Sequence, residues 1–152
     1  MNKPDPAREV EDEARELKWN GDLTGALVLR KRLELMLNQV NAPAARQATN
    51  LNWIAFLAIC VGDLSEAERA ARRTVLLYRP VAGDRDERLA TYLMMLACVL
   101  AERRKFSEAT AHAEEAIAMF RRHHGADSQF VRDREAAIAR MRIQDTHHYI
   151  ER

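Results

Sequence analysis

The feature that most constrains the fold of this chain is a repeat of about 42 residues. Two series of alanines keep this interval: one is Ala26, Ala67 and Ala109, spaced 41 and 42 residues apart, and the other is Ala14, Ala55, Ala97 and Ala139, spaced 41, 42 and 42. Three residues that tolerate a positive φ, Asn41, Gly83 and Gly125, follow the same period. Three landmarks with one period predict structural units that each bury an apolar face against their neighbours.

The segments between these landmarks are expected to be helices. Gly occurs five times and Pro four times in 152 residues, mostly between stretches rich in Ala, Leu, Glu and Arg with apolar residues at three- and four-residue intervals. Asp5 before Pro6, and Gly62-Asp63 before Glu66, match the residues preferred at helix ends. The chain is therefore predicted to be all-α, with helices over residues 6–20, 23–40, 44–61, 64–78, 85–104, 107–123 and 128–148.

Composition narrows the classes of partner. Lys and Arg total 24 against 23 Asp and Glu, so the formal charge of +1 gives no overall attraction to nucleic acid or to an anionic membrane. No segment has the uninterrupted apolar length of a membrane span, and the N-terminal residues lack a secretory apolar core. Cys60 and Cys98 lie in apolar runs without metal-ligand spacing, and we expect free thiols. A cytoplasmic protein is the expectation.

Within each repeat, small residues, a turn residue and an "EA" pair recur in a fixed order. The second repeat carries Ala55, Ala58, Gly62, Leu64, Glu66 and Ala67, the third carries Ala97, Leu100, Arg104, Phe106, Glu108 and Ala109, and the first is looser with Ala14, Leu17, Gly21, Leu23 and Ala26. This pattern resembles the tetratricopeptide repeat (TPR). The longer period, the segment "ATNLNWIA" at 48–55 and the inter-repeat "HHGADSQFV" are similar to the repeats of the kinesin light chain type.

The resemblance implies a short right-handed α-solenoid of antiparallel helix hairpins. It would form a single domain over residues 1–152, with repeats at roughly 6–41, 42–83 and 84–125 and a capping helix over 126–150. The close approach of neighbouring helices explains the small residues, because only side chains that end at Cβ fit there.

The resemblance also places a partner-binding concave groove on the first helix of each pair. At about 100° per residue, the side chains opposite the expected core form a stripe that is apolar and aromatic in its middle. The candidate partner-binding residues are Arg15, Trp19, Thr49, Asn52, Trp53, Phe56, Thr91, Met94 and Cys98. Related repeats hold a ligand's backbone with asparagines in this segment, and here only Asn52 matches, since Trp53 replaces the next one.

Alternative interpretations of these residues stay open at this point. Phe56, Ile59 and Cys60 are equally consistent with a closed core, and Trp19 and Trp53 with sealing an interface between repeats. Asn50 and Asn52 fit solvated helix positions better than binding positions.

No pattern for chemistry is recognisable. The sequence lacks a phosphate-binding Gly loop, a nucleophile elbow, HExxH and CxxC, so we expect no enzyme, no cofactor and no small-molecule substrate. Adjacent histidines on a helix diverge by about 100°, so the pairs 123–124 and 147–148 predict no metal site. The short basic runs are diluted by acidic residues, which argues against nucleic acid.

These features predict an adaptor or scaffold that binds a protein segment or helix through its groove. One alternative is a homodimer formed through the same apolar groove or through the last helix, where we expect Phe130, Ile138, Met141 and Ile150 to pack back on the third repeat. Another is an immunity-type or regulatory protein that blocks a toxin or regulator.

Overall fold

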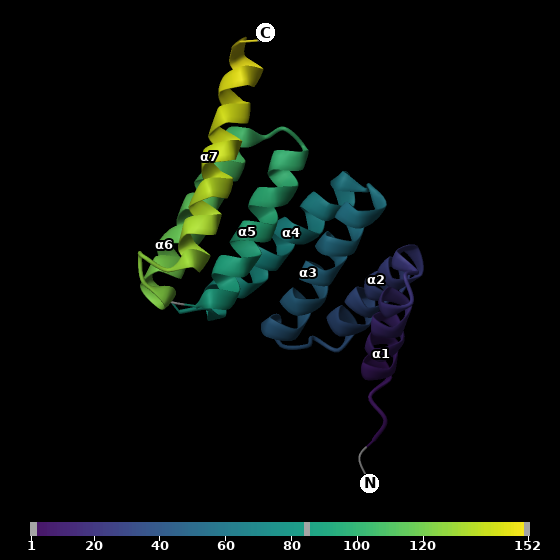
Figure 1. Cartoon of the computed structure of the whole chain (residues 1–152). Helices are drawn as coiled ribbons and strands as arrows, with labels where there is room; N and C mark the ends of the chain where they lie inside the picture. The colour runs from purple at the N-terminus through teal and green to yellow at the C-terminus, as the bar shows by residue number, and fades with distance from the viewer. Residues whose placement is uncertain (1–2, 84–85, 151–152) are drawn as a thin grey trace. The chain divides into compact units, whose positions relative to one another are not determined.

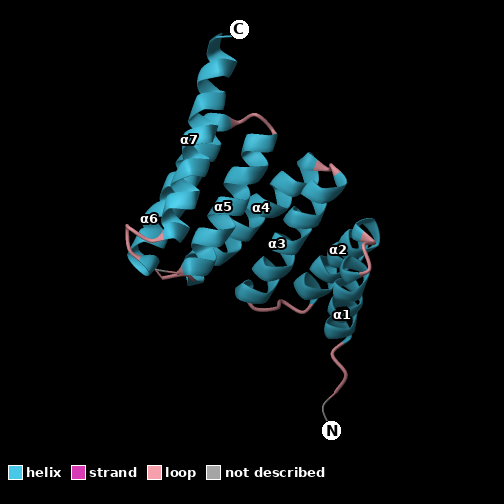
Figure 2. Ribbon diagram, in the orientation of Figure 1, coloured by secondary structure: helices cyan, strands magenta, loops and turns pink. Residues whose placement is uncertain are grey.

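The computed structural model describes residues 3–83 and 86–150, with side chains described as far as residue 143. The described backbone is helical apart from short loops and turns, with no strand among these residues (Figure 2). The α-helices are α1 (Pro6–Trp19), α2 (Leu23–Gln39), α3 (Ala44–Val61), α4 (Leu64–Tyr78), α5 (Glu87–Glu102), α6 (Phe106–His124) and α7 (Gln129–Ile150), and a short 3-10 helix, η1 (Arg79–Val81), follows α4 (Figure 1). The all-α prediction is confirmed.

The turns within the three helix pairs are built alike. The backbone N–H groups of Asp22, Asp63 and Lys105 donate to the carbonyls five residues earlier, at N–O distances of 2.9, 2.9 and 2.8 Å. Before each donor stands a residue with positive φ: Gly21 at 85°, Gly62 at 84° and, in the third turn, Arg104 at 61°. This is the hydrogen-bond pattern with which a left-handed residue closes a helix.

Side-chain caps begin the helices that the sequence marked. The Asp5 carboxylate accepts from the backbone N–H of Ala7 at 3.1 Å, with Pro6 as the first helical residue. The Asp63 carboxylate accepts from the N–H of Glu66 at 3.1 Å, as its sequence pattern predicted. Of the three loop residues expected to tolerate positive φ, Asn41 and Gly125 adopt it and Gly83 does not. Gly83 instead leads towards Asp86, whose carboxylate caps α5.

The chain divides into two compact units, residues 1–77 and 78–152, and each is described by itself. In the first unit, α2 packs against both α1 and α3. Its core holds fully buried leucines and isoleucine from α2 and α3: Leu33, Leu37, Leu51, Ile54 and Leu57. Arg69 of α4 and Glu34 of α2 form an ion pair with an N–O distance of 2.9 Å, which connects these two helices at the surface of the unit.

In the second unit, α6 packs against α5 on one side and α7 on the other. Tyr78, at the end of α4, meets Tyr92 of α5 edge to face at 5.2 Å between ring centroids and donates to the Asp86 carboxylate at 2.9 Å. Phe120 of α6 meets Phe130 of α7 at 4.8 Å. Ile138 and Met141 are buried, as expected for α7, whereas the Ile150 side chain lies outside the described residues.

The alanine landmarks sit where the repeat argument requires, with one informative exception. Ala14, Ala55 and Ala97 in the first helices are at most 1% exposed, and Ala26, Ala67 and Ala109 in the second helices are fully buried. Ala139 keeps the period but is exposed. Within the described part of the chain no helix follows α7 and covers Ala139. A small side chain is therefore not required there by the close approach of a neighbouring helix.

Candidate functional site

The outward side of α3 carries the middle of the predicted binding stripe. Phe56 is 37% exposed and Cys60 is exposed, while Thr49, Asn52 and Trp53 are partly buried. The residues on the opposite side of the helix, Leu51, Ile54 and Ala58, are at most 1% exposed. The α3 stripe therefore lies at the surface of the first unit. Phe56 and Cys60, for which a core position was the alternative, are exposed, and Ile59 and Trp53 are partly buried.

Two aromatic rings and two cations, one of them buried beneath the surface, form a compact group that we call the Trp53 cluster: Lys18, Arg30, Trp53 and Phe56. The rings of Trp53 and Phe56 meet edge to face with centroids 5.9 Å apart. The Lys18 ammonium, reaching across from α1, lies 4.7 Å from the Trp53 centroid and 5.9 Å from that of Phe56. Such cation–π contacts contribute about 0.5 to 1 kcal/mol each at exposed sites, so the rings are held in a defined arrangement.

A buried polar pair supports the cluster from below. Arg30 of α2 is 3% exposed, and its guanidinium lies 5.5 Å from the Trp53 centroid on one side and donates to the Asn50 side-chain oxygen at 3.4 Å on the other. The Asn50 amide in turn donates to the Arg30 carbonyl at 2.9 Å. Burial lowers the pKa of the Arg30 guanidinium. Asn50 was expected at a solvated position; that expectation is wrong, because its amide bridges α3 to α2.

Asn52, the one asparagine that matches the related repeats, behaves differently from Asn50. Its side-chain oxygen is buried and accepts no hydrogen bond from the described residues. An unsatisfied buried acceptor costs about 1 to 3 kcal/mol. The Asn52 side-chain oxygen therefore contributes no hydrogen bond to the packing of this unit.

The candidate binding residues on α1, Arg15 and Trp19, are more exposed than most of those on α3. Trp19, the last residue of α1, is 90% exposed, so its side chain buries very little of its surface against the rest of the unit. Arg15 is exposed and its guanidinium pairs with Asp12 at 2.9 Å and Glu11 at 3.6 Å along the same helix. The structure thus places both at the surface but brings only Lys18 to the two aromatic rings; helical periodicity puts Lys18 on the same predicted stripe, although it is not among the candidate partner-binding residues.

The remaining candidates belong to α5 in the second unit. Thr91 and Cys98 are exposed and Met94 is partly buried, on the side of α5 away from the buried Leu93 and Leu96. The Thr91 hydroxyl donates to the Glu87 carbonyl at 3.0 Å. This stripe is solvent-facing, as the repeat register predicted, but less aromatic than that of α3.

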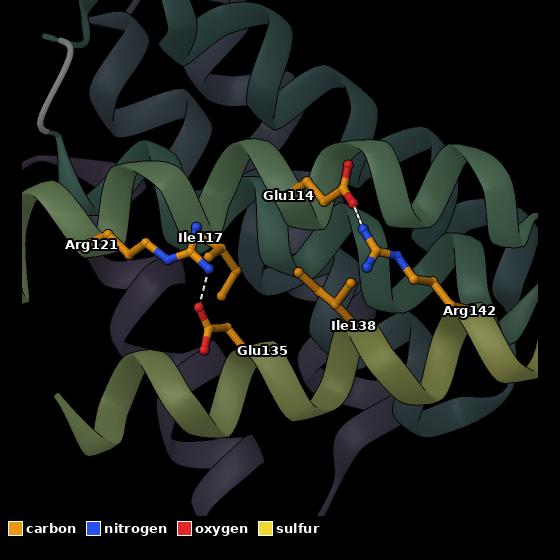
Figure 3. A pocket seen from close by; sticks show the side chains of 6 residues that line it. All are labelled: Glu114, Ile117, Arg121, Glu135, Ile138 and Arg142. Carbon is orange, nitrogen blue, oxygen red and sulfur yellow. Dashed lines mark hydrogen bonds and ion pairs between the residues drawn. The ribbon is translucent and has the colours of Figure 1, made fainter. Parts of the chain in front are cut away.

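A pocket that sequence reasoning missed lies between α6 and α7 (Figure 3). Its volume is about 380 Å³, and Ile117 and Ile138 form its apolar floor. Arg121 of α6 pairs with Glu135 of α7 at one end, and Glu114 of α6 pairs with Arg142 of α7 at the other (Figure 3). Charged residues at helical spacing are typical of a solvated face, so the sequence alone does not distinguish these bridges from ordinary surface charges.

A second group that the sequence did not bring together joins α5 and α6. His123 and His124, the last residues of α6, both approach the Glu87 carboxylate in the first turn of α5, with Nε2–O distances of 3.1 and 2.7 Å. The divergence expected for adjacent helical residues does not keep their nitrogens apart, because the long imidazole side chains reach one carboxylate from two sides.

Comparison with known proteins assigns the family. The sequence model of the tetratricopeptide repeat matches residues 46–122, about half of the chain. The chain belongs to the tetratricopeptide repeat family. TPR repeats generally mediate protein–protein interactions and are typically non-enzymatic. The matched span runs from α3 to α6, so it contains the Trp53 and Phe56 rings and the α5 stripe.

Solved TPR structures agree with this assignment. Crystal structures of nearly identical TPR-like repeats attributed to a kinesin light chain of Podosopora anserina superpose with TM-scores of 0.80 and, for a single-residue variant of the same repeats, 0.81. Sequence identity is 15% and 14%, and both alignments cover 99% of this chain and 73% of the other. The likeness confirms a TPR solenoid fold. A search of the curated proteins finds no match. None of the described TPR helices has the length and apolarity to cross a membrane.

Proposed function

We propose that this chain is a non-enzymatic TPR module that binds a protein segment through the outward side of α1 and α3. The Trp53 cluster carries the proposal: two aromatic rings are retained at the surface and oriented by Lys18 and by a buried arginine. Tryptophan is, with tyrosine and arginine, among the residues enriched at the energetic centre of protein interfaces.

The chemistry of the cluster indicates what the segment carries. An apolar side chain would pack on the exposed Phe56 ring beside Trp53, and the Lys18 ammonium favours a carboxylate next to that anchor. The Asn52 amide, whose oxygen is unsatisfied, would rotate outward to accept from a backbone N–H of the segment. We assign the α5 stripe of Thr91, Met94 and Cys98 to the same function in the second unit.

The test is quantitative capture of partners from cells by the whole chain and by variants. Phe56→Ala and Lys18→Glu are expected to reduce capture of the same proteins. The control is Leu76→Ala, which removes a comparable apolar side chain, 68% exposed, from α4, a second helix that carries none of the predicted stripe. If the Phe56 variant captures the same proteins in the same amounts as the control, the Trp53 cluster is not the binding surface.

A second candidate function is self-assembly through α7. Ile143 is 58% exposed on this helix and lies about 200° around it from the buried Met141, so it presents an apolar side chain to solvent on the side of α7 away from Met141. Light scattering over a concentration series distinguishes the two: a mass that stays at 17.4 kDa excludes the homodimer, and a doubled mass that Ile143→Glu returns to 17.4 kDa supports it.

A further inference from the structure

Three side chains that bind metals well lie together at one end of the α5–α6 hairpin. One ligand atom from each of Glu87, His123 and His124 lies within 4.8 Å of those of the other two residues. Glu87 is in the first turn of α5 and the histidines end α6, so the group joins residues 36 and 37 apart in the second unit. The cluster involves none of the residues assigned to partner binding.

The arrangement is held by more than its own polar contacts. The His124 ring packs on Phe130 of α7 with centroids 4.3 Å apart and lies 6.3 Å from Phe120. The two imidazole rings are edge to face at 4.7 Å. Apolar neighbours therefore orient His124 independently of Glu87.

The group is also accessible to an ion. The side chains of Glu87, His123 and His124 retain 40%, 45% and 30% of their accessible surface, so an ion can enter from solvent. Two cations close by in sequence are engaged elsewhere: Arg88 lies over the Tyr78 ring at 5.9 Å, and Arg121 pairs with Glu135.

We propose that Glu87, His123 and His124 bind a divalent transition-metal ion of the Zn²⁺ class. Two imidazoles and a carboxylate are a recognised ligand set for Zn²⁺, and imidazole ligands select Zn²⁺, Ni²⁺ or Cu²⁺ over Mg²⁺ and Ca²⁺. Ligand atoms about 2.1 Å from a tetrahedral ion are about 3.4 Å apart. His123 Nε2 now lies 3.1 Å from one Glu87 carboxylate oxygen and His124 Nε2 lies 2.7 Å from the other, so these atoms need to separate by about 0.3 and 0.7 Å, which exposed side chains at helix ends can accommodate.

A metal at this position would fasten the start of α5 to the end of α6. It would close the third hairpin at the end opposite its Arg104 turn, next to the loop that leads into α7. Because such an ion binds the folded hairpin and not separated helices, its binding would also raise thermal stability.

The experiment is calorimetric titration of ZnCl₂ into the whole chain after treatment with a chelator. All proteins carry His147→Gln and His148→Gln, which removes the other adjacent histidine pair. We expect one Zn²⁺ per chain, and Glu87→Gln or His123→Gln to weaken binding at least about tenfold. His112→Gln, which removes a histidine elsewhere on α6, is the matched control and should leave binding unchanged.

Thermal unfolding provides the second measurement. Zn²⁺ should raise the midpoint of the parent and of the His112 variant but not that of the Glu87 or His123 variant, and Mg²⁺ should raise none. His123→Gln, which keeps the Glu87 charge at the start of α5, serves if Glu87→Gln fails to fold. Binding that survives Glu87→Gln unchanged, or that does not occur in the parent, overturns the proposal and leaves the group as a histidine–carboxylate contact between helices.

Discussion

Replacing Ala55 by Leu tests the packing argument most directly. Ala55 is 0% exposed at the position where α3 approaches its neighbours, so three additional carbon atoms have no space to occupy. Overpacking a closed core site typically costs about 1 to 3 kcal/mol. For a chain of this size that corresponds to a fall of about 2 to 12 °C in the unfolding midpoint. Circular dichroism during thermal and urea denaturation measures the change.

The matched control is Ala139→Leu, which makes the same substitution at the same repeat position. Ala139 is exposed, so the added side chain meets solvent and the change in stability should stay within about 0.5 kcal/mol. An unchanged midpoint for the Ala55 variant, or an equal loss for both variants, would refute the conclusion that close helix contacts select these alanines.

Two further predictions concern polar groups. Asn50→Ala should destabilise the chain by about 1 to 3 kcal/mol, because it removes the hydrogen bond from Asn50 to the Arg30 carbonyl and leaves the buried Arg30 guanidinium without its Asn50 acceptor. Asn52→Ala, which removes an unpaired oxygen, should cost far less, and urea unfolding compares the two variants. A hydrogen bond from Arg79 lowers the pKa of the Glu115 carboxyl in the folded chain. The resulting stabilisation is present above the ordinary pKa of glutamate and is lost as pH falls through the lowered value. Glu115→Gln should therefore cost a few tenths of a kcal/mol near neutral pH, the pair being exposed, and nothing in strong acid, as urea midpoints at several pH values would show.

Much of the fold follows from the sequence because helix, turn and small-residue positions are local properties repeated along the chain. The helix boundaries agree with the structure within two residues, and the outward exposure of Phe56 and Cys98 follows from helical periodicity alone. Gly83 shows the limit of the repeat, since it occupies a landmark position without the expected backbone conformation.

The polar contacts between helices were not predictable in the same way. Arg30 and Asn50 are 20 residues apart, and each resembles an ordinary solvated residue in its own helix. The same holds for Glu87 with the two histidines of α6 and for the two ion pairs of the α6–α7 pocket. Their pairing depends on how far one helix is rotated and shifted against the next, and single-helix periodicity contains no information about that register.

The turn at Arg104 has a consequence for how such repeats diverge. Arg104 adopts the left-handed conformation that Gly21 and Gly62 adopt in the other two turns, although for a residue with a Cβ this conformation costs about 1 to 2 kcal/mol. The backbone hydrogen bond after it, from Lys105 to Leu100, is as short as its counterparts. The packed helices on either side evidently impose the turn. The spacing of the helices therefore fixes this turn, and a residue other than the glycine that a motif search looks for can occupy it with the same geometry.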